Sequence, residues 1–138
     1  MGFHMLLLAN HISFKRRLLA GLKEYNISSG QPKILDYLGI NDGCQQKDIA
    51  DNCYVETATL STVLAKMERN GLITREPLEE DRRSYRIRLT DKGRSLVSIV
   101  DQEFEKLEDV ALEGFSEEEK TQFVSYMERM RSNLQENK

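Results

Sequence analysis

The sequence is poor in the residues that usually build catalytic or metal sites. Its 138 residues include only two cysteines and two histidines. Cys44 and Cys53 lie nine residues apart with no neighbouring Cys/His pair, which is not the spacing of a zinc site. The chain also has no Ser/His/Asp set and no phosphate-binding glycine loop. We therefore expect no enzyme activity, no metal and no cofactor.

Long hydrophobic runs are missing too. The apolar stretch from Met5 to Ala9 is too short to span a bilayer, and no basic segment precedes it as in a signal peptide. The sequence therefore predicts a cytoplasmic protein without membrane contact. With only two prolines, 39% hydrophobic and 31% charged residues, a folded, helix-rich chain is favoured over disorder.

The charge is distributed unevenly along the chain. The formal net charge of −3 argues against general affinity for nucleic acid. Residues 57–94, however, carry nine Lys/Arg against six acids, whereas residues 34–56 carry one against five and residues 95–138 carry five against eleven. The basic middle is either a local surface that faces phosphates or the ordinary mixed charge of helical surfaces.

Hydrophobic periodicity and turn residues predict mainly helices and one hairpin. The second helix would be capped by Ser28 or Ser29, with Pro32 in its first turn. Gly71 would stop the fourth helix, Thr90 would cap the fifth, and Ser116 with Glu119 would form a capping box. The expected helices are 3–25, one ending near 39, 45–52, one from 56 or 57 to 70, and two long ones starting at 90 and 116; the expected strands are 72–76 and 85–89.

This order predicts a mainly α (α+β) fold, a winged helix-turn-helix with about six helices and a short β-hairpin wing. A helix can enter the major groove of DNA and present short polar side chains to the bases. On the helix from residue 57, one stripe is apolar and the other face carries polar residues suited to DNA: Thr57, Thr59, Ser61, Thr62 and Lys66. A solvated amphipathic helix would look the same, but the basic hairpin that follows favours DNA binding.

The loop between the strands carries Arg82 and Arg83. An arginine at a hairpin tip can enter the minor groove, where the potential is most negative. Asp81 would orient the loop by pairing with Arg75 or Arg83. The neighbouring acids Glu79 and Glu80 are expected to point to solvent on the far side.

At this point the chain resembles the MarR family of transcriptional regulators. The combination of E-x-x-G-L-I-x-R, D-x-R and L-T-x-x-G in this order carries the resemblance. The matching segments are Gln46–Ala50, Thr59–Met67, Glu68–Arg75, Asp81–Ser84 and Arg88–Gly93. The resemblance implies a homodimer that binds a near-palindromic DNA site through residues 28–93, dimerises through residues 1–27 and 94–138, and acts as a repressor. It also implies release by a small ligand or by cysteine oxidation.

The chain departs from the family pattern in two respects. Thr62 stands where many members have an arginine on the recognition helix. Neither cysteine lies in the first helix, where one peroxide-sensing branch keeps its reactive thiol. Cys44 and Cys53 are therefore interpreted either as small apolar residues or as a redox switch.

The resemblance places a ligand pocket between the dimerisation helices and the winged region. The residues concerned would be His11, Phe14, Lys15 and Tyr37, which are otherwise simply core or interface residues. Wide apolar stripes on the first and last helices favour the homodimer over intramolecular packing. A winged-helix module that binds another protein, without specific DNA binding, is the alternative function.

Overall fold

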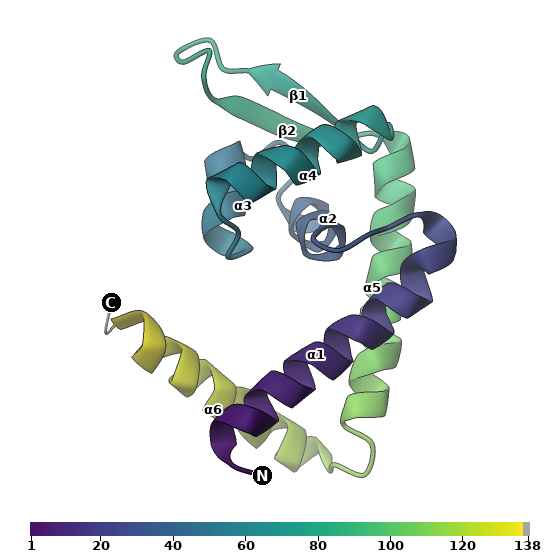
Figure 1. Cartoon of the computed structure of the whole chain (residues 1–138), viewed down its shortest axis with the longest axis vertical. Coiled ribbons are helices and arrows are strands. Elements are labelled where there is room, and N and C mark those ends of the chain that lie inside the picture. Colours follow the sequence, from purple (N-terminus) through teal and green to yellow (C-terminus); the bar gives the residue numbers. More distant parts are fainter. Residues whose placement is uncertain (137–138) are drawn as a thin grey trace. The chain divides into compact units, whose positions relative to one another are not determined.

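The computed structural model describes residues 1–136, which form helices and one two-stranded hairpin (Figure 1). They fall into two compact units, residues 1–105 and the segment from residue 106 onward, which are described separately. The elements are α1 (Phe3–Leu22), the 3-10 helix η1 (Lys23–Tyr25), α2 (Gln31–Ile40), α3 (Gln46–Asn52), α4 (Thr57–Arg69), β1 (Ile73–Pro77), β2 (Tyr85–Leu89), α5 (Asp91–Ala111) and α6 (Glu117–Glu136). The expected order of elements is confirmed.

The core of the first unit lies where α2, α3 and α4 meet the hairpin. Each of these elements contributes fully buried aliphatic side chains, as does α5. They include Leu35 and Leu38 of α2, Ile49 of α3, Leu60, Leu64 and Met67 of α4, Ile73 of β1, Ile87 of β2 and Val100 of α5. The apolar stripe predicted for α4 therefore faces inward, and its opposite face is available for other contacts.

The start of α2 differs from the prediction. No serine side chain caps this helix; its N-cap is Gly30, at φ +90°. Glycine adopts this left-handed conformation without steric cost. The hydroxyl of Ser28 is used elsewhere, because it accepts a hydrogen bond from Lys66 of α4 at 3.1 Å. The expected serine cap is thus wrong. The Gln31 N–H donates to the Ser28 carbonyl oxygen at 3.2 Å, and the Ser28 hydroxyl bonds to α4.

The junction between α4, the hairpin and α5 follows the prediction closely. After α4, Gly71 has φ +76°, as a C-terminal cap requires. In the hairpin, Ile73 lies opposite Leu89 and Pro77 opposite Tyr85, so β1 starts one residue later than expected. Thr90 caps α5 by accepting a hydrogen bond from the Gly93 N–H at 3.1 Å. Its hydroxyl also donates to the carbonyl oxygen of Gly71, which joins the end of α4 to the start of α5.

The second unit consists of the end of α5 and the helix α6. Ser116 and Glu119 form the predicted capping box, with bonds of 3.1 Å and 2.8 Å between side chain and backbone. The rings of Phe115 and Phe123 meet edge to face at 5.9 Å. Several apolar side chains of this unit are exposed, among them Val110, Phe123, Val124, Met127 and Leu134.

Two structural features are absent from residues 1–136. No helix there is long and apolar enough to cross a membrane. No cluster of three or more His, Cys, Asp or Glu side chains there is arranged to hold a metal ion.

Candidate nucleic-acid interface

The loop between α2 and α3 runs along the outer edge of β2. The Gly43 N–H donates to the Ile87 carbonyl, and the Ile87 N–H donates to the Cys44 carbonyl, both at 2.8 Å. A further antiparallel bridge pairs Gln45 with Arg86. These bonds satisfy an edge strand that would otherwise expose unpaired backbone groups. They also attach the hairpin to the helix-turn-helix.

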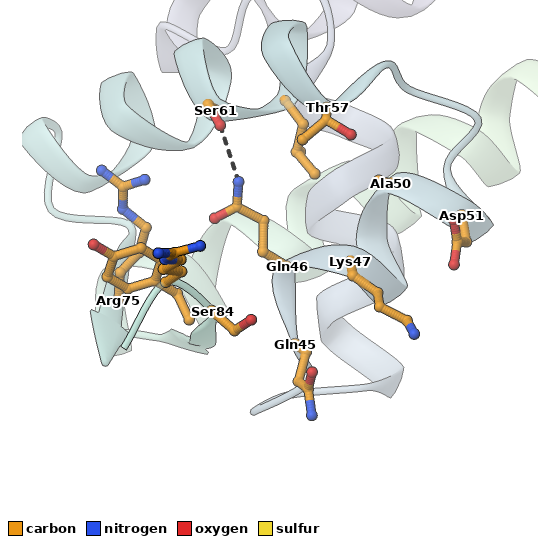
Figure 2. Close-up of a pocket in the computed structure, with 12 residues that line it drawn as sticks. Gln45, Gln46, Lys47, Ala50, Asp51, Thr57, Ser61, Arg75 and Ser84 are labelled. Atoms are coloured by element: carbon orange, nitrogen blue, oxygen red, sulfur yellow. Dashed lines mark hydrogen bonds between the residues drawn. The ribbon is translucent and has the colours of Figure 1, made fainter. Parts of the chain in front are cut away.

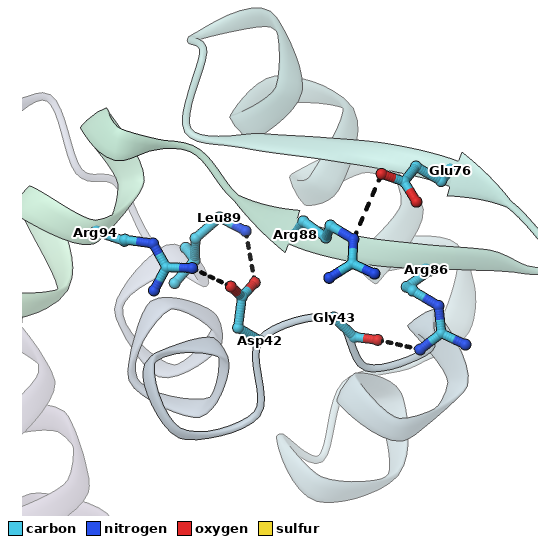
Figure 3. Close-up of polar contacts among 7 residues, drawn as sticks. All are labelled: Asp42, Gly43, Glu76, Arg86, Arg88, Leu89 and Arg94. Atoms are coloured by element: carbon cyan, nitrogen blue, oxygen red, sulfur yellow. Dashed lines mark hydrogen bonds and ion pairs between the residues drawn. The ribbon is translucent and has the colours of Figure 1, made fainter.

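Asp42 strengthens this attachment through its carboxylate (Figure 3). One oxygen accepts a hydrogen bond from the Leu89 N–H at 2.8 Å, and the other pairs with the Arg94 guanidinium of α5. Only 24% of the Asp42 side chain is exposed, so these bonds are partly shielded from water. Asp42 therefore links the α2–α3 loop, the end of β2 and the start of α5.

Two arginines of β2 complete the contacts in Figure 3. Arg86 donates from its guanidinium to the Gly43 carbonyl oxygen. Arg88 pairs with Glu76 of β1 at 3.5 Å, with both side chains about half exposed. Arg86 is thus committed to the loop, whereas the exposed Arg88 pair contributes little to stability.

The outer face of α4 carries the polar residues predicted to read DNA. Thr57, Thr59 and Thr62 are exposed, and Ser61 is half-buried. Thr62 donates its hydroxyl proton to the Ala58 carbonyl oxygen of its own helix at 3.3 Å. Lys66 is exposed, but its ammonium group bonds to Ser28, so it is held toward the turn before α2.

A hollow of about 520 Å³ separates this face from the hairpin (Figure 2). Its walls come from three elements: α3, the start of α4 and the hairpin. The lining residues are Gln45, Gln46, Lys47, Ala50, Asp51, Thr57, Leu60, Ser61, Arg75, Arg83, Ser84 and Tyr85. The structure thus brings Thr57 and Ser61 of α4 together with Arg75 and Arg83, which are far away in sequence.

Asp81 orders the hairpin loop, but not through an arginine side chain. Its carboxylate accepts hydrogen bonds from the backbone N–H of Arg83 at 3.0 Å and from the Ser84 hydroxyl at 3.2 Å. The expected ion pair with Arg75 or Arg83 is therefore wrong. A short aspartate side chain reaches the N–H two residues ahead more readily than a guanidinium farther away.

Arg75 has different partners from those predicted. Its guanidinium pairs with Glu68 of α4 at 3.2 Å and lies 5.5 Å from the centre of the Tyr85 ring. The ion pair connects α4 to β1, and the ring contact connects β1 to β2. Arg75 thus holds the base of the wing against α4, while the Asp81 bonds order its tip.

Several charged side chains of the wing line two separate hollows, whereas Arg82 lines neither. Arg83 lines the hollow beside α4, and neither Arg82 nor Arg83 pairs with an acid among the described residues. Glu79 and Glu80 line another hollow of about 290 Å³, together with Glu76 and Arg86. The acids flanking the loop are therefore kept off the surface that Arg83 shares with α4.

The four residues predicted for a ligand pocket line neither hollow. His11 and Lys15 are exposed on α1, and the ring of Phe14 stacks on Phe104 of α5 at 6.4 Å between centres. The Tyr37 hydroxyl accepts a hydrogen bond from Asn52 of α3 at 3.2 Å. The pocket stays a prediction.

Comparison with known proteins explains this arrangement. The model of the MarR family matches residues 27–85, which include α2, α3, α4 and β1. The transcriptional regulator PecS of Dickeya dadantii is 33% identical over 118 residues, which cover 83% of this chain and 71% of PecS. The chain belongs to the MarR family. It is accordingly a MarR-type transcriptional regulator, and this family is not one of enzymes.

Solved structures of MarR proteins share the whole fold. The S. aureus MepR–DNA complex superimposes with a TM-score of 0.89 at 29% identity, covering 97% of this chain and 99% of MepR. A putative MarR-family regulator from Listeria monocytogenes, solved with a 26mer DNA, reaches a TM-score of 0.92 at 23% identity, covering 99% and 91% of the two chains. The second likeness shows the fold alone. Together they confirm the predicted winged helix-turn-helix.

The two cysteines of this MarR chain are poor nucleophiles. Burial and, to a smaller extent, the nearby Asp48 carboxylate raise the pKa of the Cys44 thiol to about 11. Burial also raises the pKa of Cys53, whose thiol donates to the Lys33 carbonyl oxygen at 3.6 Å. Since the thiolate is the reactive form, this environment favours the interpretation of both as structural residues.

Sequence reasoning missed three residues of the site: Asp42, Gln46 and Glu68. The sequence gives no signal for the role of Asp42, because its partners lie 47 and 52 residues away. Gln46 was noted only as part of the family match, although it bonds to Ser61 of α4. A signal did exist for Glu68, because it occurs with Arg75 in the E-x-x-G-L-I-x-R segment and has the opposite charge.

Replacing Asp42 with alanine should loosen the wing. The Leu89 N–H would lose a charged acceptor in a shielded position, which costs about 1–3 kcal/mol of unfolding free energy. Urea unfolding followed by circular dichroism measures this loss. Glu76→Ala is the matched control, because it breaks an exposed pair and should cost below about 1 kcal/mol. Equal losses for both variants would contradict the role assigned to Asp42.

The Cys44 thiol should alkylate slowly in the native protein. With a pKa of about 11, only roughly one thiol in a thousand is ionised at pH 8. The rate with iodoacetamide, followed on the Cys44 peptide by mass spectrometry, should rise tenfold per pH unit from pH 7 to 10. The urea-unfolded chain is the control and should level off near the pKa of about 8.5 of a free thiol. A native rate that levels off below pH 9 would disprove the raised pKa.

Proposed function

We propose that this MarR protein is a sequence-specific DNA-binding regulator, which binds a palindromic operator as a homodimer and represses transcription. One observation carries the proposal: the polar face of α4 and the wing residue Arg83 border the same hollow. A helix that reads the major groove and an arginine that enters the adjacent minor groove need this proximity.

The charges around the hollow support this proposal. Lys47, Arg75 and Arg83 line it against a single acid, Asp51. Glu79 and Glu80 line the other hollow, where they would not repel phosphates as strongly. Because the protein as a whole has a net charge of −3, this locally basic face would attract DNA while the rest of the surface would not. MepR, which shares the fold at 29% identity, was solved in complex with DNA.

The homodimer is supported by apolar side chains that are exposed in the single chain. The first half of α1 exposes Phe3, Met5, Leu6, Leu7, Leu8 and Ile12, each to 42% or more. The second unit exposes a comparable set on α6 and near its start. Patches this extensive mark interfaces in folded proteins. We assign residues 1–27 and 94–138 to dimerisation and residues 28–93 to DNA binding. The two-fold axis of the dimer would then place one α4 helix at each half of a palindromic site.

Release by a small ligand is part of the same proposal. His11, Phe14, Lys15 and Tyr37 stay the predicted lining of its pocket, which would be completed by dimerisation. Their chemistry, two aromatic rings with a cationic and an imidazole side chain, suits an aromatic acid. The regulator would act in the cytoplasm, where it meets the DNA.

DNA binding is tested first with a randomised pool of double-stranded oligonucleotides. We expect the wild-type protein to enrich one palindromic sequence and to bind it more weakly as salt rises, because phosphate contacts release counterions. Arg83→Ala should weaken binding of that duplex by about 10-fold or more, the value of a charge-assisted contact. Fluorescence anisotropy measures both effects.

Arg129→Ala is the control for Arg83→Ala, because it removes the same charge from the exposed side of α6. It should leave the affinity unchanged. No enrichment by the wild-type protein even at low salt would refute DNA binding and favour a protein-binding module.

The dimer is tested by its mass in solution. Sedimentation equilibrium should give twice the 16.0 kDa of the chain. Leu8→Glu on α1 and Val124→Glu on α6 should each shift the mass toward the monomer, because a carboxylate in an apolar interface is costly to desolvate. Ile40→Glu, at an exposed apolar position of α2 outside both dimerisation segments, is the control. A monomeric wild-type chain at micromolar concentration would contradict the dimer.

A further inference from the structure

Gln46 at the start of α3 extends its side chain across the hollow to the recognition helix α4. Its amide nitrogen Nε2 donates a hydrogen bond to Ser61 Oγ at 3.1 Å, between residues 15 apart in sequence. Figure 2 shows this amide directed at Ser61, whereas the neighbouring Lys47 and Gln45 point elsewhere. Gln46 and Ser61 are both half-buried and line the hollow between α4 and the wing.

The surroundings of Gln46 favour this orientation of its amide. The amide oxygen points toward the side of the hollow where Arg75 lies (Figure 2). Arg75 and Arg83 both line the hollow, and their guanidinium groups are donors only. An oxygen facing cationic donors and an amino group facing a hydroxyl is the electrostatically favourable arrangement. The same contact holds α3 against α4 at the point where DNA would approach.

This hydrogen bond determines what the Ser61 hydroxyl can offer. A hydroxyl has one proton to donate and two lone pairs to accept with. Because Gln46 donates to the oxygen, one lone pair is occupied and the proton of Ser61 must point to another acceptor. Thr62 is in the opposite situation, since its proton already goes to the Ala58 carbonyl oxygen. Ser61 thus keeps its proton to donate and one lone pair to accept with, whereas Thr62, on the same helix, is left only to accept.

We infer that Gln46 is a positioning residue for base recognition, which turns the Ser61 proton toward an acceptor on the DNA. This inference rests on the proposed function. In the major groove the matching acceptors are N7 and O6 of guanine, N7 of adenine and O4 of thymine, whereas the amino groups of cytosine and adenine suit Thr62. Ser61 can therefore donate to an acceptor on one base while Thr62 accepts from a donor on another, although Thr62 stands where many MarR proteins have an arginine.

The inference is tested with Gln46→Met, which keeps the length of the side chain and removes its hydrogen-bonding groups. The probes are the duplex enriched by the wild-type protein, its single-base variants and a scrambled duplex of equal length. Gln46→Met and Ser61→Ala should each lower the discrimination at the same base pair about 2- to 10-fold, the value of one hydrogen bond. The double variant should lose no more than either single variant, because both changes remove one contact.

Gln46→Glu provides a second, sharper variant. A carboxylate only accepts, so the Ser61 proton would turn toward Glu and Ser61 would become an acceptor for DNA. The preferred base at that position should then change rather than merely relax. Because the new charge weakens binding of every duplex, each affinity is divided by that for the scrambled duplex.

The outcomes separate this inference from the proposed function. If the wild-type chain enriches no duplex, both fail. If it enriches one and Gln46→Met keeps the full base preference, only the inference fails. It also fails if the effects of Gln46→Met and Ser61→Ala add up, or if Gln46→Met weakens the enriched and scrambled duplexes equally, as a purely structural role would. Thermal unfolding of each variant confirms that the comparison is made on folded protein.

Discussion

The main-chain pairing between the α2–α3 loop and strand β2 is the constraint on which the rest of the site depends. A two-stranded hairpin is only marginally stable alone, and its edges are left unpaired. Here Gly43 and Cys44 pair with Ile87, and the Asp42 carboxylate continues the pattern to Leu89. The α2–α3 loop thereby pairs with the outer edge of β2 and joins the hairpin to the helix-turn-helix. Together with the Arg75–Glu68 pair between β1 and α4, this pairing fixes where Arg83 lies relative to the polar face of α4.

Within that frame, the polar groups of α4 are not equivalent. The Thr62 proton is bound to its own helix, the Lys66 ammonium is bound to Ser28, and Ser61 is held by Gln46. A row of threonines and serines read from the sequence looks like interchangeable groove contacts. In the folded chain each hydroxyl has a direction, because neighbouring groups occupy its proton or its lone pairs. Direction, rather than residue type, decides which base edge each can match.

The sequence predicted the elements well because their signals are local. The apolar stripe from Leu60 to Met67, the positive φ of Gly71 and the Thr90 cap all act within a few residues. The site itself was only half predictable. The sequence indicates Arg83 through its position in the wing and α4 through its polar face, and their contact with DNA stays a prediction. Asp42 could not be found, since a carboxylate in a turn has no pattern that reveals a partner 52 residues later.

The prediction for Asp81 shows the same limit at short range. Its role in ordering the loop was inferred correctly from charge, but an arginine was chosen as partner where the backbone N–H of Arg83 and the Ser84 hydroxyl serve. The difference matters for the proposed complex. An arginine paired with Asp81 would have its charge neutralised and its side chain held to the loop. Because Asp81 binds the backbone instead, the loop is ordered while the Arg83 guanidinium is kept available for phosphate or a minor groove. The backbone of Arg83 therefore helps to order the wing, while the side chain of the same residue supplies the charge at its tip.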